Sequence, residues 1–156
     1  MHLAQLNVAR MLAPLDSPEL ADFVASLAPV NAAADAAPGF VWRLADESGT
    51  GATSIRLFDD DMLLVNMSVW ASPEALAAFV YRQRDHAGAL RRRREWFEPA
   101  GSPMVVLWWV EEGHRPDLPE ASERLAHLRT HGPSGHAFPF KLPVPEPAPS
   151  LEGGRV

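Results

Sequence analysis

The chain of 156 residues contains no cysteine, and this absence excludes several kinds of site. Without thiols there is no disulfide, no thiolate metal site and no cysteine nucleophile. Long apolar runs are also missing, so no segment is long enough to cross a bilayer as a helix. Residues 1–5 lack the basic start of a signal peptide. We therefore expect a cytoplasmic protein that has no membrane among its partners.

Positive charge is scarce as well. Acidic residues outnumber basic ones by 20 to 14, which gives a net charge of −6 at pH 7. Lysine occurs once, at Lys141, and four arginines are consecutive at residues 91–94. Nucleic-acid binding requires a basic surface, so nucleic acid is not expected as a partner. Hydrophobic residues make up 47% of the chain, a composition typical of one globular domain of this length.

Segments with the hydrophobic pattern of a strand and segments with that of a helix follow one another along the chain. Alternation of apolar and polar residues predicts strands at residues 2–10, 40–46 and 62–70, and a strongly apolar run predicts a fourth at residues 103–110. Helical spacing predicts helices at residues 18–36, 73–96 and from 118 to Gly132. Ser17 and Ser72 are expected to cap the first two helices. Pro29 should kink the first near residues 25–27, and the second should bend near Gly88.

The order βαββαβ followed by an extra helix predicts an α+β, ferredoxin-like fold. We expect a four-stranded antiparallel sheet in a domain of residues 1–142, with helices on one of its faces. Residues 143–156 are rich in proline and glycine, and we expect this tail to be extended or disordered.

The third predicted strand has two unlike faces, because alternate residues of a strand point to opposite sides. One face is entirely apolar and carries Leu63, Val65, Met67 and Val69. A second copy of the chain is expected to cover it, which gives a homodimer that forms a barrel. The other face carries Leu64, Asn66, Ser68 and Trp70. It is expected to line a pocket for a small molecule, although its polar groups could instead satisfy nearby backbone while Trp70 caps a core.

Several stretches together resemble the DUF3291 family within the dimeric α/β-barrel superfamily. They include residues 3–10, 38–44, 64–70, 81–86, 90–97, 107–116, 120–133 and 137–138. The superfamily contains cofactor-independent monooxygenases that oxidise polycyclic phenols, in which an Asn and a Trp four apart on the third strand contact substrate. The resemblance therefore implies such a role for Asn66 and Trp70.

Other members of the superfamily bind and degrade heme, using an Asn on the first strand, a Trp on the third and a His on the second helix. Asn7, Trp70 and His86 occupy comparable elements. His86 lies more than one helical turn further from the Trp than in those enzymes, which weakens the case for heme ligation. Heme is thus a possible cofactor, and otherwise no cofactor is expected.

The candidate catalytic residues are Asn66, Trp70 and His86, with His86 as the base. Arg82 shares a helix face with His86 and could bind an enolate, a phenolate or a carboxylate. Arg82 could instead form a surface ion pair, and His86 could be structural. The remaining candidates for substrate binding are Asn7, Trp42 and Trp109.

Trp108 and Trp109 are adjacent on a strand, so one of them should face the pocket and the other the core. No metal site is expected, because the spacing of Glu112 and His114 matches no zinc signature.

The leading functional hypothesis is a small-molecule enzyme, a monooxygenase-like protein without a cofactor that acts on an aromatic or enolisable substrate. The alternatives are a heme-binding protein and a non-catalytic dimer that binds a small ligand.

Overall fold

The computed structural model describes residues 1–46, 52–53, 55–57, 60–84 and 89–149. Its centre is a four-stranded sheet made of β1 (His2–Arg10), β2 (Phe40–Arg43), β3 (Leu63–Trp70) and β4 (Val105–Val110). The strands follow the order β2-β3-β1-β4, and every neighbouring pair is antiparallel. The predicted α+β fold and its antiparallel sheet are therefore confirmed.

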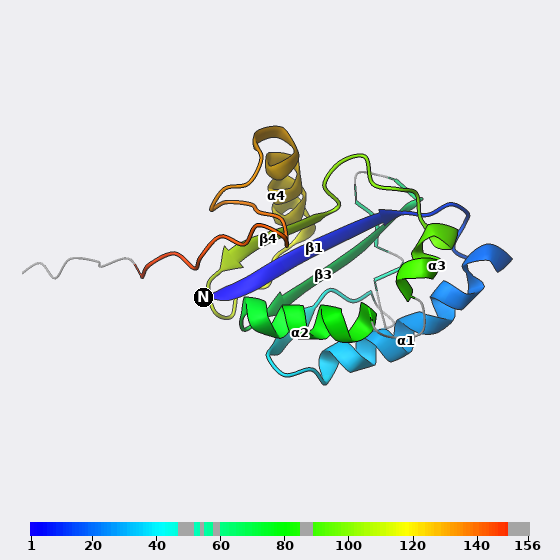
Figure 1. The fold of residues 1–156 in the computed structure, drawn as a ribbon, viewed down its shortest axis with the longest axis horizontal. Helices are drawn as coiled ribbons and strands as arrows, with labels where there is room; N and C mark the ends of the chain where they lie inside the picture. The colour runs from blue at the N-terminus through cyan, green and yellow to red at the C-terminus, as the bar shows by residue number, and fades with distance from the viewer. Residues whose placement is uncertain (47–51, 54, 58–59, 85–88, 150–156) are drawn as a thin grey trace, which may run out of the picture.

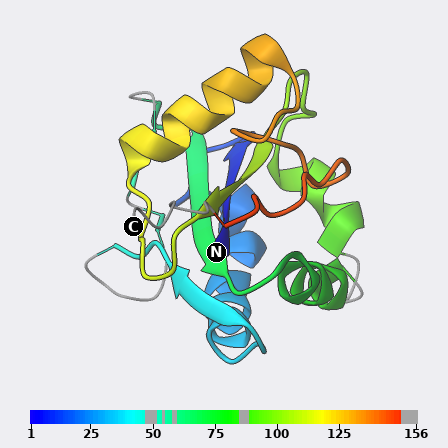
Figure 2. The ribbon, with the colours of Figure 1, turned by 90° about the vertical axis from the view of Figure 1, so that its left-hand side faces the viewer.

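Helices lie on both sides of this sheet. They are α1 (Ala21–Asp35), which follows the short 3₁₀ helix η1 (Pro18–Leu20), then α2 (Pro73–Arg84), α3 (Ala89–Trp96) and α4 (Leu118–His131). Figures 1 and 2 show α1, α2 and α3 on one side of the sheet and α4 on the other. The prediction that all helices cover one face is therefore wrong. None of the described helices is both long and apolar enough to span a membrane.

The predicted serine cap is confirmed at the start of α2 and is wrong at the first helix. Ser72 Oγ accepts a hydrogen bond from Ala75 N at 3.2 Å, and Asp117 caps α4 in the same way. Ser17 instead donates its hydroxyl to Pro14 O, so the first turn is 3₁₀ and α1 begins only at Ala21. A side chain bonded backwards cannot cap the turn that follows it.

The second predicted helix is divided into α2 and α3. Both lie within the predicted range of residues 73–96, and residues 85–88 between them, including Gly88 where a bend was expected, lie outside the described residues. The first helix, in contrast, continues through Pro29.

The apolar face of β3 is buried within the single chain. Val65, Met67 and Val69 form one hydrophobic cluster with α4, which contributes Ala121, Leu125 and Leu128. All six side chains are at most 6% exposed. The premise of the predicted homodimer, an apolar face left open for a second copy, is therefore wrong.

A tight turn connects α1 to β2 at the start of α2. Gly39 has a φ of +81°, a conformation that favours glycine, and a Cβ there would lie 2.5 Å from the Cβ of Ala75. Gly39 O also accepts a hydrogen bond from Ala71 N at 2.7 Å. The turn thus sets the distance between β2 and α2.

The segment after α4 returns to the sheet. Phe138 exchanges two backbone hydrogen bonds with Leu107 of β4. Beyond residue 142 the described chain has no regular secondary structure. Val144 O accepts a hydrogen bond from Trp109 Nε1 at 3.0 Å, and Glu146 pairs with the amino terminus at 2.6 Å.

Candidate functional site

A cavity of about 340 Å³ lies between the sheet and the three helices α1, α2 and α3. This volume falls within the lower range of small-molecule pockets. The polar part of its wall comes from β1 and β3, with Gln5, Asn7, Asn66 and Ser68. Its apolar part includes Phe23, Leu27, Val30, Leu76, Phe79, Val80 and Phe97. The cavity is therefore mainly apolar, with polar groups concentrated on the sheet.

The polar side chains of the sheet form a connected network. Trp70 Nε1 and Gln5 Nε2 both donate to Ser68 Oγ, at 2.9 and 3.1 Å. Gln5 Nε2 also donates to Asn66 Oδ1 at 3.0 Å. Ser68 is 6% exposed, whereas Asn66 is exposed and lines the cavity. The network therefore links a buried indole to an amide that a ligand can reach.

Asn7 lies directly opposite Asn66 in the β1–β3 register. Its Oδ1 atom is buried and has no hydrogen-bond partner among the described residues. A buried acceptor without a partner is costly, because its hydration is lost without replacement. A ligand that donates a hydrogen bond to Asn7 would remove this cost.

Aromatic rings close both ends of the cavity. Trp70 is 1% exposed, stacks on Phe79 at 5.1 Å between centroids, and meets Phe40 edge-on. At the other end Phe23 meets Phe97 edge-on at 4.9 Å. Trp70 thus belongs to a fixed wall, because its ring is packed and its N–H is bonded.

The charged groups of the described lining are two arginines, Arg43 and Arg93, and no carboxylate or imidazole lines this part of the cavity. Arg43 Nε donates to Asp35 Oδ1 at 2.7 Å, and this bond holds the pKa of Asp35 below its usual range. The cavity is consequently suited to neutral or anionic ligands.

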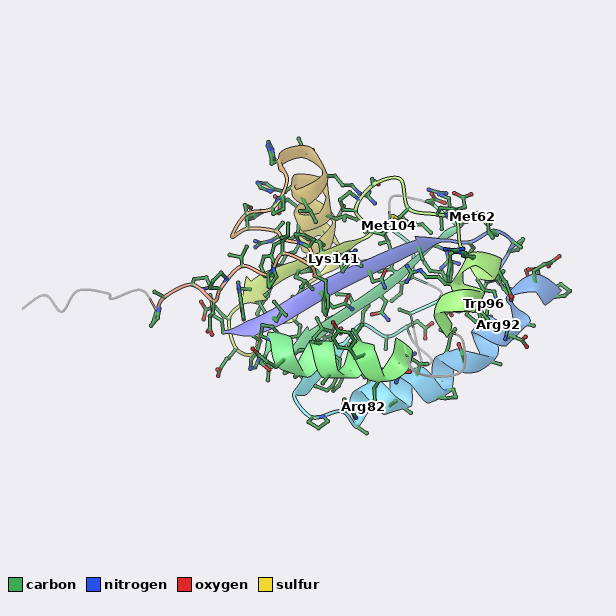
Figure 3. All side chains as sticks on the ribbon, in the orientation of Figure 1. Met62, Arg82, Arg92, Trp96, Met104 and Lys141 are labelled. Carbon is green, nitrogen blue, oxygen red and sulfur yellow. The ribbon has the colours of Figure 1, made fainter. Side chains whose placement is uncertain are left out.

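The structure brings together three of the predicted site residues, since Asn7, Asn66 and Trp70 all line the cavity. His86 lies outside the described residues. Arg82, labelled in Figure 3, is exposed on α2 and does not line the cavity. The residues of α2 that line the cavity are Leu76, Phe79 and Val80. Arg82 lies two residues beyond Val80 and therefore on a different face of the helix.

Trp42 and Trp109, which were both predicted to bind substrate, do not line the cavity. A β-bulge between Phe40 and Trp42 shifts the register of β2, so Phe40 pairs with Trp70 while Trp42 pairs with Val69. Trp42 therefore packs in the cluster on the α4 side. Trp109 does share the cavity face of the sheet, opposite Leu3, but Val144 of the C-terminal segment contacts it there.

Trp108 points to the opposite side, as expected for neighbours on a strand. It is fully buried under α4 and donates its indole N–H to Glu120 Oε1 at 3.0 Å. The second carboxylate oxygen of Glu120 lies 2.6 Å from His114 Nε2. Within the described part of the chain, no group of His, Cys, Asp or Glu side chains could hold a metal ion.

Gln5, Phe23 and Arg93 are among the lining residues that were not predicted as site residues. Gln5 shares the strand parity of Asn7, which was a usable signal. Phe23 and Arg93 come from helices, and the sequence does not show which helix face meets the sheet.

Comparison with known proteins identifies the family. The family model described as a domain of unknown function (DUF3291) matches residues 2–152. No curated protein and no solved structure matches the chain. Because the model spans almost the whole sequence, the chain belongs to the DUF3291 family.

Proposed function

We propose that the protein binds a flat, mainly apolar small molecule with hydrogen-bonding groups in the cavity between the sheet and α1, α2 and α3. The observation that carries this proposal is the polar row of the sheet within an otherwise apolar cavity. Ligand pockets typically combine apolar walls with a few polar groups that fix orientation.

The polar row offers both kinds of hydrogen bond to a ligand. Asn7 Oδ1 is an acceptor without a described partner. Asn66 already accepts from Gln5 through Oδ1, while its amide N–H groups have no described partner. A hydroxyl group on the ligand could donate to Asn7, and a carbonyl or phenolate oxygen could accept from Asn66.

Fluorescence of N-phenyl-1-naphthylamine tests this proposal, because this neutral aromatic probe brightens in apolar sites. We expect saturable binding to the full chain. Leu27→Trp should weaken it at least about tenfold, since the larger side chain occupies the cavity. Val24→Trp is the matched control, on the same helix but exposed and outside the cavity. Equal binding by both variants would refute the proposed site.

A second candidate function is oxidation of the bound molecule by O2 without a cofactor. It is favoured by Asn66 and Trp70, the pair matched by the resemblance to phenol-oxidising enzymes, since both line this cavity. In such a step a base removes a proton from an enolisable ring CH2. O2 then converts this carbon to a carbonyl, and its second oxygen leaves as water. Asn66 would stabilise the oxyanion, and His86 is the candidate base.

Oxygen uptake with polycyclic phenols tests this reaction. Asn66→Ala should reduce the rate about 100-fold, a typical cost of removing one oxyanion donor. His86→Ala should abolish the dependence of the rate on a group that titrates near neutral pH. Unchanged uptake in both variants would exclude these roles. Ligand binding without any uptake would instead support the non-catalytic alternative.

Heme binding is a further alternative, and it depends on His86 as the iron ligand. Adding hemin should then produce a Soret band that His86→Ala removes. An unchanged hemin spectrum would exclude it.

A further inference from the structure

We infer that the ligand of this cavity is an aromatic acid whose anionic group binds Arg93. The inference rests on the proposed binding function and specifies its ligand. It starts from the charge of the cavity wall, which contains arginine and, among the described residues, no acid.

The two lining arginines differ in their partners. Both Arg43 Nε and Arg43 Nη2 donate to the carboxylate of Asp35, so the charge of Arg43 is compensated within the protein. Arg93 forms no ion pair with any residue that the structure describes. Its guanidinium is therefore available to a ligand, and guanidinium binds carboxylates through paired hydrogen bonds.

The acidic side chains near α3 form ion pairs with Arg92, the neighbour of Arg93. Arg92 Nη2 lies 2.6 Å from Asp22 Oδ2, and Arg92 Nε lies 3.2 Å from Glu95 Oε2. Its guanidinium also lies 5.0 Å from the ring centre of Trp96, and both residues are labelled on α3 in Figure 3. Two acids near α3 thus serve Arg92, which leaves Arg93 beside the cavity with its charge uncompensated.

The sheet register gives the ligand a direction. Leu3 pairs with Trp70 at one end of β1, Asn7 pairs with Asn66 in the middle, and Arg10 pairs with Leu63 at the other end. The α3 helix lies at this last end, because Leu12 N donates to Trp96 O and Met11 bridges to Phe97. A ligand anchored at Arg93 would extend past the two asparagines toward the wall formed by Trp70 and Phe79.

An arginine at this position also has an explanation that involves no ligand. Arg93 and Arg94 both lie in the last turn of α3, where positive charge is favoured by the helix dipole. This explanation applies equally to the two residues, but only Arg93 lines the cavity. Arg94 is exposed on the same turn and is therefore a matched control.

The test compares 2-naphthoate with 2-naphthamide, which have nearly the same shape and differ in charge. Each compound competes with N-phenyl-1-naphthylamine for the full chain. We expect 2-naphthoate to bind about tenfold more tightly than 2-naphthamide. Arg93→Gln should abolish this preference, mainly by weakening the binding of 2-naphthoate. Arg94→Gln should keep the preference, and Arg93→Lys should keep part of it.

Failure of this inference differs from failure of the proposed function. If the fluorescent probe binds but the two compounds compete equally, or if Arg94→Gln has the same effect as Arg93→Gln, the anion site is refuted while the cavity remains a binding site. If the probe does not bind, or binds equally to the Leu27→Trp and Val24→Trp variants, both proposals fail.

Discussion

The two polar residues of β3 have different surroundings, although they share one face of the strand. Ser68 is buried and accepts hydrogen bonds from Gln5 and from the Trp70 indole. Asn66 is exposed to the cavity and accepts one, from Gln5. We therefore assign Ser68 to the support of the wall and Asn66 to contact with the ligand.

Removing the Ser68 hydroxyl should destabilise the fold. Ser68→Ala leaves the buried Trp70 N–H without a partner, which costs about 1–3 kcal/mol in the free energy of unfolding. Asn66→Ala should cost less than about 1 kcal/mol, because a solvent-accessible amide can be replaced by water. Urea unfolding measures both values. A loss for Asn66→Ala as large as that for Ser68→Ala would contradict the division between support and contact.

Sequence parity identified the cavity-facing side of β1 and β3, because alternation in a regular strand leaves no other choice. It placed Asn7, Asn66 and Trp70 on one wall, as the structure does. Parity failed for Trp42, because one bulge in β2 moves the residues that follow it to the opposite face of the sheet. The difference in burial between Ser68 and Asn66 was also not predictable. It depends on which side chains of the three helices cover each residue.

At the scale of elements, the cavity depends on α1, α2 and α3 covering one face of the sheet. Strands and helix starts were largely predictable from alternation and capping residues. The side of the sheet that each helix covers was not. A helix of mixed polarity such as α4 can pack against either face, and only the three-dimensional path of the chain decides.

The turn at Gly39 should not tolerate a side chain. Gly39→Ala places a Cβ against Ala75 and forces a φ of +81° on a residue that disfavours it. We expect a loss of about 1–3 kcal/mol in unfolding free energy, together with weaker binding of N-phenyl-1-naphthylamine as β2 and α2 separate. Gly113→Ala is the matched control, because Gly113 has a similar φ of +86° but open space around it.

Comparing the two glycine variants separates the effect of backbone strain from that of the contact between the turn and α2. If both glycine variants lose the same stability and keep the same probe affinity, the effect is backbone strain alone, and the close approach of the turn to α2 does not shape the cavity.

At the scale of the whole molecule, α4 occupies the sheet face that the strand pattern predicted a second copy would cover. Burial of a large apolar side chain contributes about 1.5–3 kcal/mol, and Leu125 and Leu128 from α4 are both buried against this face. The pattern of the strand alone did not show that a later helix of the same chain would cover this face. The structure shows that one amphipathic helix is sufficient.

The thermal stability of the full chain tests whether this cover is complete. An obligate dimer has an unfolding midpoint that rises with protein concentration, because association and folding are coupled. We expect the Tm to stay constant over about a hundredfold range of concentration, since α4 buries the face within one chain. Leu125→Ala should lower the free energy of unfolding by about 2–5 kcal/mol, again without concentration dependence, because it opens a space beneath α4. A Tm that rises with concentration in the unmodified chain would show that folding requires a second copy, and that the face covered by α4 is not the only apolar surface the chain must bury.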